Sequence, residues 1–343
     1  MNNTEIQAKV LRAIEPGEIE RAVDAAVELL KAGDVVALPT ETVYGLAANA
    51  LNPDAVAKIF AVKGRPSNNP LIVHVSSVYM AKRCVRQWSG EAQKLANNFW
   101  PGPLTIVLPK SEIIPPVVTA GGETVGVRFP SHSVIQKIIE KCGFPLAAPS
   151  ANISNRVSPT TAEHVLRQLG NRIKLIVDGG ACHVGIESTV FDVASNPPRV
   201  LRPGIIHEES LFAALGKKPS REQFEERENR TLRSPGLFKK HYAPIARLVC
   251  VEWRSQQELI AKLTELGALP EFTRILAYSN LPEDLRRWKT ILMPKKALAY
   301  ARALYAELHR CDEEGVKWII VQTPPEQTQW DAIHDRLKRA SAT

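Results

Sequence analysis

One segment of the sequence interrupts an otherwise regular alternation of short apolar runs and amphipathic stretches. Residues 217–244 contain twelve charged side chains among 28 and no sustained apolar period, which is typical of a linker between domains. The chain on either side is long enough to bury a hydrophobic core of its own. We therefore expect a larger domain over residues 1–216, a linker over 217–244 and a smaller domain over 245–343.

The segment before the linker alternates between strand-length and helix-length patterns. Apolar residues recur at helical spacing over residues 18–33 and 132–143, and Asn52-Pro53 is a typical N-terminus for a third helix ending near residue 64. Apolar runs of strand length lie at residues 34–39, 71–75, 104–109, 124–129, 145–150, 173–178 and 188–193. Because some of these strands follow one another with no helix between them, the pattern predicts an α/β domain with a twisted mixed sheet.

The segment after the linker repeats the alternation on a smaller scale. Strand-like runs at residues 245–251, 274–279 and 318–322 are separated by amphipathic stretches at 255–267 and 297–315. This rhythm predicts a Rossmann-like parallel α/β domain. Its sequence contains no GxGxxG motif, so a dinucleotide site there is not supported.

The composition is that of a soluble globular protein. Apolar residues make up 44% and charged residues 23% of the chain, and no apolar run reaches the roughly 18 residues that span a bilayer. The five cysteines form no CxxC zinc or redox motif. We expect reduced thiols, no membrane association and a cytoplasmic location, because the first twenty residues lack the apolar stretch of a signal peptide.

The positive charge is concentrated in the linker. The formal net charge of +8 favours an acidic partner such as a nucleotide or a nucleic acid. Residues 1–216 and 245–343 each carry only two more basic than acidic side chains, whereas residues 217–244 carry eight basic and four acidic ones. The excess charge therefore marks the linker rather than the surface of either domain.

A polar loop over residues 39–46 (PTETVYGL) follows the first strand directly. Its hydroxyls and carboxylate would lie at the carboxyl end of that strand, where ligands of α/β sheets bind. A polar turn in which Thr42 and Tyr44 satisfy backbone groups explains the pattern equally well. Spacing alone leaves both interpretations open.

A second loop, residues 63–70, begins with Lys63 and Arg65 at the end of a helix. Cations there complement the helix dipole, so a purely structural role is possible. Two prolines and a glycine nevertheless stiffen a loop rich in hydrogen-bond donors, which favours phosphate recognition. His74 lies in the following strand, where a lone histidine is usually a hydrogen-bonded core residue.

Further polar groups follow later strands. Residues 149–152 (PSAN) and 157–160 (VSPT) carry Ser150, Asn152 and Ser158, which could equally form turns and a helix N-terminus. Arg128 lies within a strand, where burial without an anion is costly and function is therefore favoured. The sequence contains no Walker A, HExxH or GxSxG motif, so any nucleotide would be held by Lys, Arg, Ser and Asn side chains.

Six strings taken in order resemble the YrdC-like family in its long form, the threonylcarbamoyl-AMP synthases with an additional C-terminal domain. They are PTETVYGLAANA, KGRPSNNPLIVH, PSANISNRVSPT, GIESTVFDV, LRPG and SPGLFKKHYAP. The resemblance implies a nucleotidyltransferase that converts L-threonine, bicarbonate or CO2, and ATP into threonylcarbamoyl-AMP and pyrophosphate. The product would serve a downstream threonylcarbamoyl-transferase complex that modifies adenosine beside the tRNA anticodon.

The resemblance also implies roles for individual residues. Lys63 and Arg65 would act in catalysis. The basic linker would be a lid that meets the triphosphate, with Tyr242 closing over the nucleotide, and weak tRNA contact is a further expectation. The residues expected around L-threonine are Thr42, His74, Arg128 and Ser188. The residues expected around ATP are Lys63, Arg65, Asn69, Thr124, Ser150, Asn152, Ser158, Arg202 and Tyr242. Mg²⁺ is expected chiefly on phosphate oxygens and water, so no metal-ligating residue is named.

Two other functions are compatible with parts of the pattern. The net charge would suit a tRNA- or double-stranded-RNA-binding protein with a basic concave surface. A carbamoyl-transfer domain of hydrogenase maturation would share the fold, but that setting usually brings CxxC zinc segments, which this sequence lacks.

Overall fold

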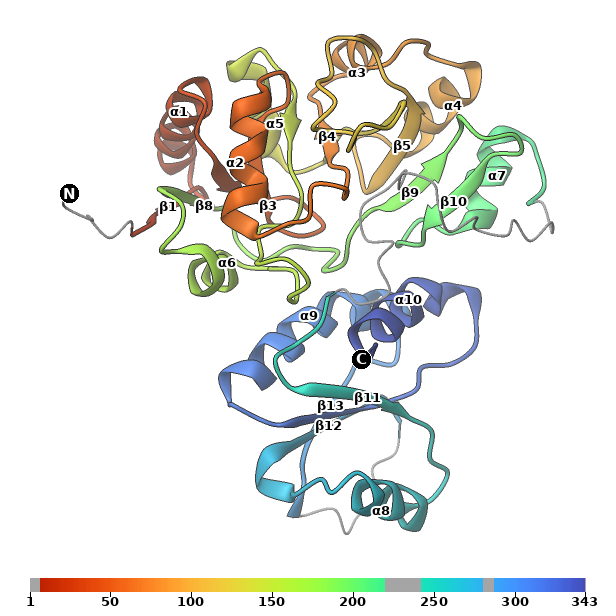
Figure 1. Ribbon diagram of the computed structural model, residues 1–343. Coiled ribbons are helices and arrows are strands. Elements are labelled where there is room, and N and C mark those ends of the chain that lie inside the picture. Colours follow the sequence, from red (N-terminus) through yellow and green to blue (C-terminus); the bar gives the residue numbers. More distant parts are fainter. Residues whose placement is uncertain (1–6, 220–241, 280–286, 343) are drawn as a thin grey trace. The chain divides into compact units, whose positions relative to one another are not determined.

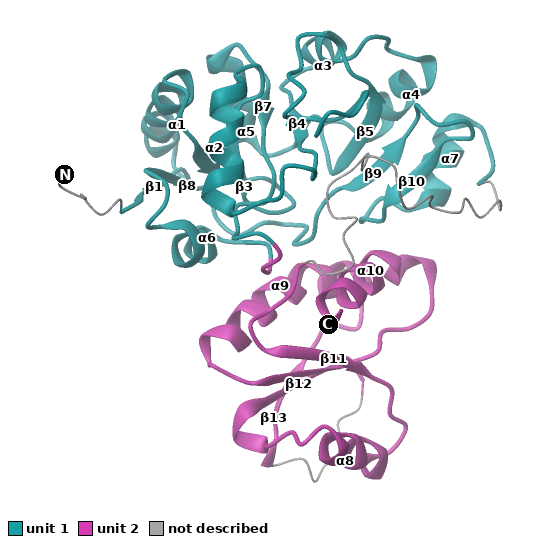
Figure 2. Ribbon diagram, in the orientation of Figure 1, with its two compact units in different colours: residues 1–154, 158–237 teal, residues 155–157, 238–343 magenta. Residues whose placement is uncertain are grey.

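Two compact units make up the computed structural model of the protein (Figures 1 and 2). The structure describes residues 7–219, 242–279 and 287–342. Contacts group residues 1–154 and 158–237 into unit 1, and residues 155–157 and 238–343 into unit 2. Most of the linker expected over 217–244 lies outside the described residues, so its boundaries and its role as a lid stay predictions.

Unit 1 contains ten strands and seven helices among its described residues. They are β1 (Lys9–Arg12), α1 (Pro16–Lys31), β2 (Val36–Leu38), β3 (Gly45–Asn49), α2 (Pro53–Lys63), β4 (Ile72–His74), α3 (Val78–Cys84), α4 (Gly90–Phe99), β5 (Leu104–Pro109), β6 (Thr124–Arg128), α5 (Ser133–Cys142), β7 (Leu146–Ala147), α6 (Ala162–Leu169), β8 (Leu175–Asp178), β9 (Thr189–Asp192), β10 (Arg199–Arg202) and α7 (Glu208–Leu215).

The strands of unit 1 form one sheet in the order β1-β8-β2-β3-β7-β4-β6-β5-β9-β10. Neighbours β4 and β6, β5 and β9, and β2 and β8 are parallel, whereas β5 and β6, β3 and β7, and β4 and β7 are antiparallel. The expected α/β domain with a mixed sheet is therefore confirmed.

Each face of this sheet has its own apolar core. Along β2, Val36 and Leu38 pack with α1 and α5, whereas Ala37 between them packs on the other face with α2, α3, α4, α6 and α7 (Figure 1). This alternation is what strands covered on both faces require. The face covered by α1 and α5 continues over β4, β5 and β9. There, among the described residues, its apolar core is the small cluster of Ile72, Val107 and Val190.

The helix next to the candidate site is fixed at both ends by its sequence. The side chain of Asn52 accepts hydrogen bonds from the backbone amides of Asp54 and Ala55 at 3.0 and 3.2 Å, which caps the N-terminus of α2. Gly64 ends the helix with φ 59°, a left-handed conformation that glycine adopts without strain. As a result, Lys63 is the last residue of the helix and Arg65 begins the loop.

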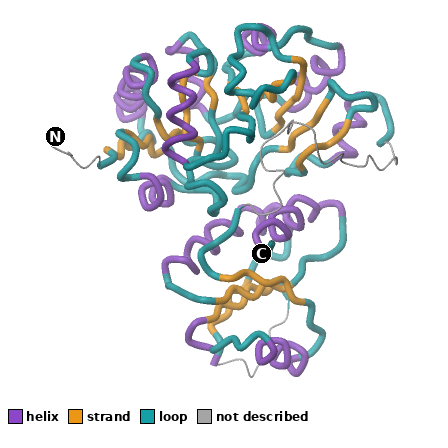
Figure 3. Tube along the Cα trace, in the orientation of Figure 1, coloured by secondary structure: helices purple, strands orange, loops and turns teal. Residues whose placement is uncertain are grey.

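Unit 2 is built on a four-stranded sheet in the order β11-β14-β12-β13, with all neighbours parallel. Its elements are β11 (Arg247–Val251), α8 (Gln256–Glu265), η1 (Pro270–Phe272), β12 (Thr273–Ala277), β13 (Lys289–Leu292), α9 (Ala297–Glu313), β14 (Trp318–Gln322), η3 (Thr328–Trp330) and α10 (Asp331–Ala340). In both units the strands run through the interior with helices outside (Figure 3). The Rossmann-like parallel architecture expected for this segment is confirmed.

No helix in the part of the chain that the structure describes is both long and apolar enough to cross a membrane.

Candidate active site

A row of polar side chains crosses the middle of the unit 1 sheet. His74 at the end of β4 lies beside Arg128 at the end of β6, and Arg128 lies beside Thr105 of β5. Side chains at paired positions share a face of the sheet, and it is the face on which α1 and α5 pack, because His74 is also paired with the core residue Leu146. The row therefore lies next to the part of this face that those helices cover.

The loop after β2 brings an acidic group to this row. Glu41 and Arg128 form an ion pair at 2.7 Å between Oε1 and Nη2, and each residue is about 95% buried. Thr42, the next residue, is fully buried, and its hydroxyl lies 2.9 Å from that of Thr40. Three of the residues expected around threonine, Thr42, His74 and Arg128, are thus close to one buried ion pair.

His74 has an unusual electrostatic environment. Burial, followed by the positive charge of Arg128, lowers its pKa to about 3. The imidazole is therefore neutral at pH 7. The backbone carbonyl of Ile72 acts in the opposite sense and raises its pKa, but the buried Nδ1 makes no well-aligned hydrogen bond. This differs from the hydrogen-bonded core histidine that is usual within a strand.

Ser188 connects the threonine set with the ATP set. Its hydroxyl lies 2.8 Å from that of Thr105 at the end of the row. Nη2 of Arg202 donates hydrogen bonds to the Ser188 hydroxyl at 3.2 Å and to its carbonyl at 3.0 Å. Arg202 is itself buried, so a guanidinium from the expected nucleotide site adjoins a hydroxyl from the expected threonine site.

Lys63 and Arg65 point into the protein rather than into solvent at the end of α2. Nζ of Lys63, which is only 1% exposed, donates to the backbone carbonyls of Ser150 and Asn152, both at 2.5 Å. Burial and, secondarily, the charge of Arg65 hold the pKa of Lys63 well below its usual value. Arg65 donates to the carbonyls of Asn69 and Pro70 at 3.1 and 2.8 Å. Lys63 and Arg65 are therefore buried and hydrogen-bonded, rather than surface charges that only complement the helix dipole.

The remaining nucleotide candidates lie on adjoining loops. The amide of Asn152 is buried and donates from Nδ2 to the carbonyl of Ile153 at 2.7 Å. The Ser158 hydroxyl donates to Oε1 of Glu187 at 2.6 Å, and both residues are buried. Lys63 therefore joins the loops of Ser150 and Asn152 to the end of α2.

Two predicted residues stand apart from this group. Thr124 shares the face of Arg128 but lies at the opposite end of β6, four residues or roughly 13 Å along the strand. Tyr242 belongs to unit 2, where it is buried, stacks on Tyr305 with ring centroids 6.0 Å apart and lies beneath Arg336. Their roles toward ATP stay predictions.

Buried polar atoms without hydrogen-bond partners concentrate at the candidate site. They include both carboxylate oxygens of Glu41, Oδ1 of Asn69, Nδ1 of His74 and Nη2 of Arg128. Native proteins leave few buried polar groups unsatisfied, and such groups call for an explanation. A polar ligand carrying both donors and acceptors would satisfy this set.

Comparisons with known proteins identify the family. Residues 28–204 match the Sua5/YciO/YrdC family, described as "Telomere recombination", and residues 206–342 match "Threonylcarbamoyl-AMP synthase, C-terminal domain". The threonylcarbamoyl-AMP synthase of Pyrococcus abyssi is 39% identical over 92% of this chain and 93% of its own length. That of Bacillus subtilis is 40% identical over 92% of both chains.

The chain belongs to the threonylcarbamoyl-AMP synthase family. A solved structure agrees with this assignment, because the crystal structure of P. abyssi Sua5 complexed with L-threonine has a TM-score of 0.85. It is 37% identical and covers 97% of this chain and 98% of that chain. The expected family, the fold class and the enzyme class, a nucleotidyltransferase, are confirmed.

Sequence reasoning missed three residues of the candidate site. Glu41 pairs with Arg128, Thr105 contacts Ser188, and Glu187 accepts the Ser158 hydrogen bond. Glu41 and Glu187 lie within the strings that carry the family resemblance, so the motifs were a signal for them. Thr105 lies within an apolar strand run and could be found only from the pairing of β5 with β6.

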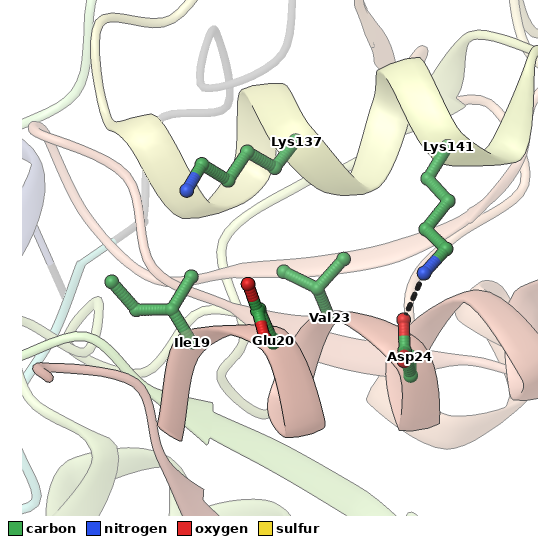
Figure 4. Close-up of a pocket in the computed structure, with 6 residues that line it drawn as sticks. All are labelled: Ile19, Glu20, Val23, Asp24, Lys137 and Lys141. Atoms are coloured by element: carbon green, nitrogen blue, oxygen red, sulfur yellow. Dashed lines mark hydrogen bonds and ion pairs between the residues drawn. The ribbon is translucent and has the colours of Figure 1, made fainter. Parts of the chain in front are cut away.

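Neither a metal cluster nor the groove between α1 and α5 adds to the candidate site among the described residues. The described residues contain no group of three or more His, Cys, Asp and Glu side chains that could hold a metal ion. A shallow groove between α1 and α5 is lined by Ile19, Glu20, Val23, Asp24, Lys137 and Lys141 (Figure 4). An exposed ion pair between Asp24 and Lys141 crosses it, and none of the candidate site residues lines it.

Proposed function

We propose that the chain forms threonylcarbamoyl-AMP from L-threonine, bicarbonate or CO2, and ATP. The deprotonated threonine amine adds to CO2 and gives a carbamate. A carbamate oxygen then attacks the α-phosphorus of ATP in line, and pyrophosphate leaves. The observation that carries this proposal is the buried row of His74, Arg128 and Thr105, with the Ser188 hydroxyl in contact with that of Thr105. The row lies in a chain that is 37% identical to a synthase solved with L-threonine.

The threonine end of the reaction is assigned to the polar row. Arg128 would bind the threonine carboxylate, since charge-assisted hydrogen bonds to a guanidinium are short and strong. Thr42 and Ser188 offer hydroxyls to the remaining polar groups, and neutral His74 can accept or donate one hydrogen bond. Burial strengthens these contacts because water no longer competes for them.

The ATP end is assigned to the loops around Lys63. Attack on the α-phosphorus spreads negative charge over phosphate oxygens, so positioned cations stabilise the transition state. Lys63, Arg65 and Arg202 supply positive charge or donors there, and Asn69, Ser150, Asn152 and Ser158 supply neutral hydrogen-bonding groups. Mg²⁺ would enter with ATP and stay mainly on phosphate and water oxygens. Thr124 and Tyr242 are proposed contacts at the edges of this site.

The proposal extends to the setting of the reaction. The described cysteines are all free thiols, which is typical of the cytoplasm, and we place the reaction there. The product would pass to a separate threonylcarbamoyl-transferase complex acting on tRNA. RNA binding as the main function is not favoured, because half of the net charge lies in the 28-residue linker rather than on either domain.

Pyrophosphate release tests the proposed function. The full chain incubated with ATP, Mg²⁺ and bicarbonate should release pyrophosphate when L-threonine is added, and a threonine-derived adenylate should accumulate in the same sample. L-Threonine should be required for release. Release at the same rate without threonine would contradict the proposal.

A further inference from the structure

The proposed reaction leaves one buried charge of the site without a role. Glu41 is 5% exposed, and neither of its carboxylate oxygens accepts a hydrogen bond. Its contact with Nη2 of Arg128 is close, at 2.7 Å, but lacks the directional geometry of a hydrogen bond. The pair is thus held by charge alone.

Such an arrangement is poor as a structural element. A buried ion pair recovers its desolvation cost only when further hydrogen bonds satisfy both partners. Glu187, a second buried carboxylate of unit 1, has such a bond, because it accepts one from Ser158 at 2.6 Å. Glu41 lacks it. Nε of Arg128 donates to the carbonyl of Gly102 at 3.4 Å, but its Nη2 has no hydrogen bond. An unsatisfied carboxylate beside this free end of a guanidinium is matched instead to a ligand that carries both charges.

A free amino acid carries both charges on two groups that are attached to the same α-carbon. Its carboxylate needs a cation with several donors, which Arg128 provides. Its ammonium group has three donors and no acceptor, so it needs an anion with free lone pairs, which the two oxygens of Glu41 provide. The neighbouring Thr42 can reach the ligand from the same loop.

We propose that Glu41 binds the α-ammonium group of the substrate while Arg128 binds its α-carboxylate. The amino acid enters between the two side chains and replaces their mutual contact, so each buried charge keeps an opposite charge beside it. Glu41 is then a substrate-binding residue that selects a free amino acid over acids without an amine. This inference rests on the proposed function, in which the amino acid is L-threonine.

Two ligands that differ in a single group isolate the role of Glu41. Titration calorimetry compares L-threonine with (2S,3R)-2,3-dihydroxybutanoate, in which a hydroxyl replaces the amine. The full chain should prefer threonine by at least about tenfold. In Glu41→Gln, threonine affinity should fall roughly 10- to 100-fold, the value of a hydrogen bond to a charged group. Affinity for the hydroxy acid should change less than about threefold, because Arg128 is retained.

Asp192→Asn is the matched control, because it removes another buried carboxylate of unit 1, one outside the candidate site that accepts hydrogen bonds from the amides of Ala194 and Ser195. It should keep the preference for the amine. Equal losses of both ligands in Glu41→Gln would mean that Glu41 only positions Arg128, and an undiminished preference for threonine would exclude contact with the ammonium group. Either result overturns the inference, as does an equal loss of preference in Asp192→Asn.

Folding and function are separated by two further measurements. Circular dichroism shows whether Glu41→Gln is folded, and if it is not, Glu41→Asp takes its place as the test. Glu41→Asp retains the negative charge, so it should keep part of the preference for threonine. Complete loss of the preference in a folded Glu41→Asp variant would contradict the inference, as would full preference in Glu41→Gln. If the unaltered chain binds neither acid, the proposed function fails together with the inference; if it binds threonine normally, only the variants decide.

Discussion

At the scale of single residues, the candidate site is built from charges that the protein has already removed from water. Lys63 donates to the carbonyls of Ser150 and Asn152, and Arg128 faces Glu41. A site of this kind binds anions strongly because its donors are fixed before the ligand arrives. Its cost is that some ionisable groups have pKa values far from their usual range.

Lys63 provides a test by proton uptake. Burial lowers its pKa in the free protein, and the phosphates of bound ATP should raise it again. A group whose pKa rises on binding takes up protons, so ATP binding should be accompanied by proton uptake at pH values between the lowered pKa of free Lys63 and its raised pKa with ATP bound. Calorimetry in buffers of different ionisation enthalpy measures it directly.

Lys63→Met is the variant for this experiment, because its side chain has similar length and no charge. It should abolish the uptake and lower turnover about 100-fold or more, as expected for loss of a cation in phosphoryl-type transfer. Unfolding by urea should remain cooperative. Unchanged turnover would mean that Lys63 only braces the loops of Ser150 and Asn152.

At the scale of elements, strand pairing determines where the site lies. The row of His74, Arg128 and Thr105 exists because β4, β6 and β5 are neighbours in a fixed register. Thr189, the first residue of β9, pairs with Leu104, the first residue of β5. This pairing brings the preceding residue, Ser188, to the row. Packing at the ends of these strands should therefore affect the site.

Gly204 provides a test at this scale. A Cβ atom there would lie 2.4 Å from the backbone nitrogen of Thr189 and 2.8 Å from the carbonyl carbon of Ser188. Gly204→Ala should therefore displace the start of β9 and lower the free energy of unfolding by about 1–3 kcal/mol, the usual cost of overpacking. Urea denaturation measures this loss.

Gly90→Ala is the control for Gly204→Ala. A Cβ atom at Gly90, in the first turn of α4, would meet nothing within 4 Å. It should leave stability unchanged or raise it by up to about 1 kcal/mol, because alanine is the better helix former. Equal stability of the two variants would show that the backbone around Ser188 can yield.

Sequence reasoning predicted two helices from their apolar periodicity, but it did not predict a short edge strand. The helices expected over 18–33 and 132–143 are α1 and α5, whose buried residues recur at helical spacing. The edge strand β1 was not expected, because it is short, charged and mostly exposed. The strand expected over 145–150 is regular only at Leu146–Ala147, with an isolated bridge between Gly45 and Ser150 beyond it, since Pro149 has no amide hydrogen to donate.

The candidate site was predictable in its residue types but not in its contacts. Ordered motifs pointed to Lys63, Arg128 and Ser188 because each lies within or beside a polar string. The partner of Arg128 could not be read from the sequence, because Glu41 is 87 residues away and meets it only through the sheet order. Tyr242 shows the opposite case, since its motif was found but its surroundings depend on Tyr305 and Arg336 in unit 2.

At the scale of the whole molecule, the chain divides into two units with separate cores and separate sheets. The division does not follow the sequence simply. Residues 155–157 leave unit 1 and join unit 2, where the amide of Ala243 donates to the carbonyl of Asn155 at 2.8 Å (Figure 2). The chain then returns to unit 1 at Ser158.

Truncation after Gly216 tests this arrangement. The fragment retains both apolar clusters of the unit 1 sheet, so it should stay folded and bind L-threonine. It loses Ala243 and with it the partner of Asn155, which lies between the nucleotide candidates Asn152 and Ser158. We expect ATP affinity or turnover to fall at least about tenfold, as measured by calorimetry and pyrophosphate release. Full activity of the fragment would contradict a role for unit 2 in nucleotide retention.

The excursion of residues 155–157 has a consequence for how such a protein can be rebuilt. A chimera made by exchanging everything after the linker has one junction at residue 217. It has a second junction at residues 155–157, which belong to unit 2 but stay with the original chain. The new second unit would meet three residues that it did not evolve with, at the place where Ala243 and Asn155 are joined. A functional exchange of the second unit therefore requires residues 155–157 to be exchanged with it, because unit 2 is not made of the C-terminal segment alone.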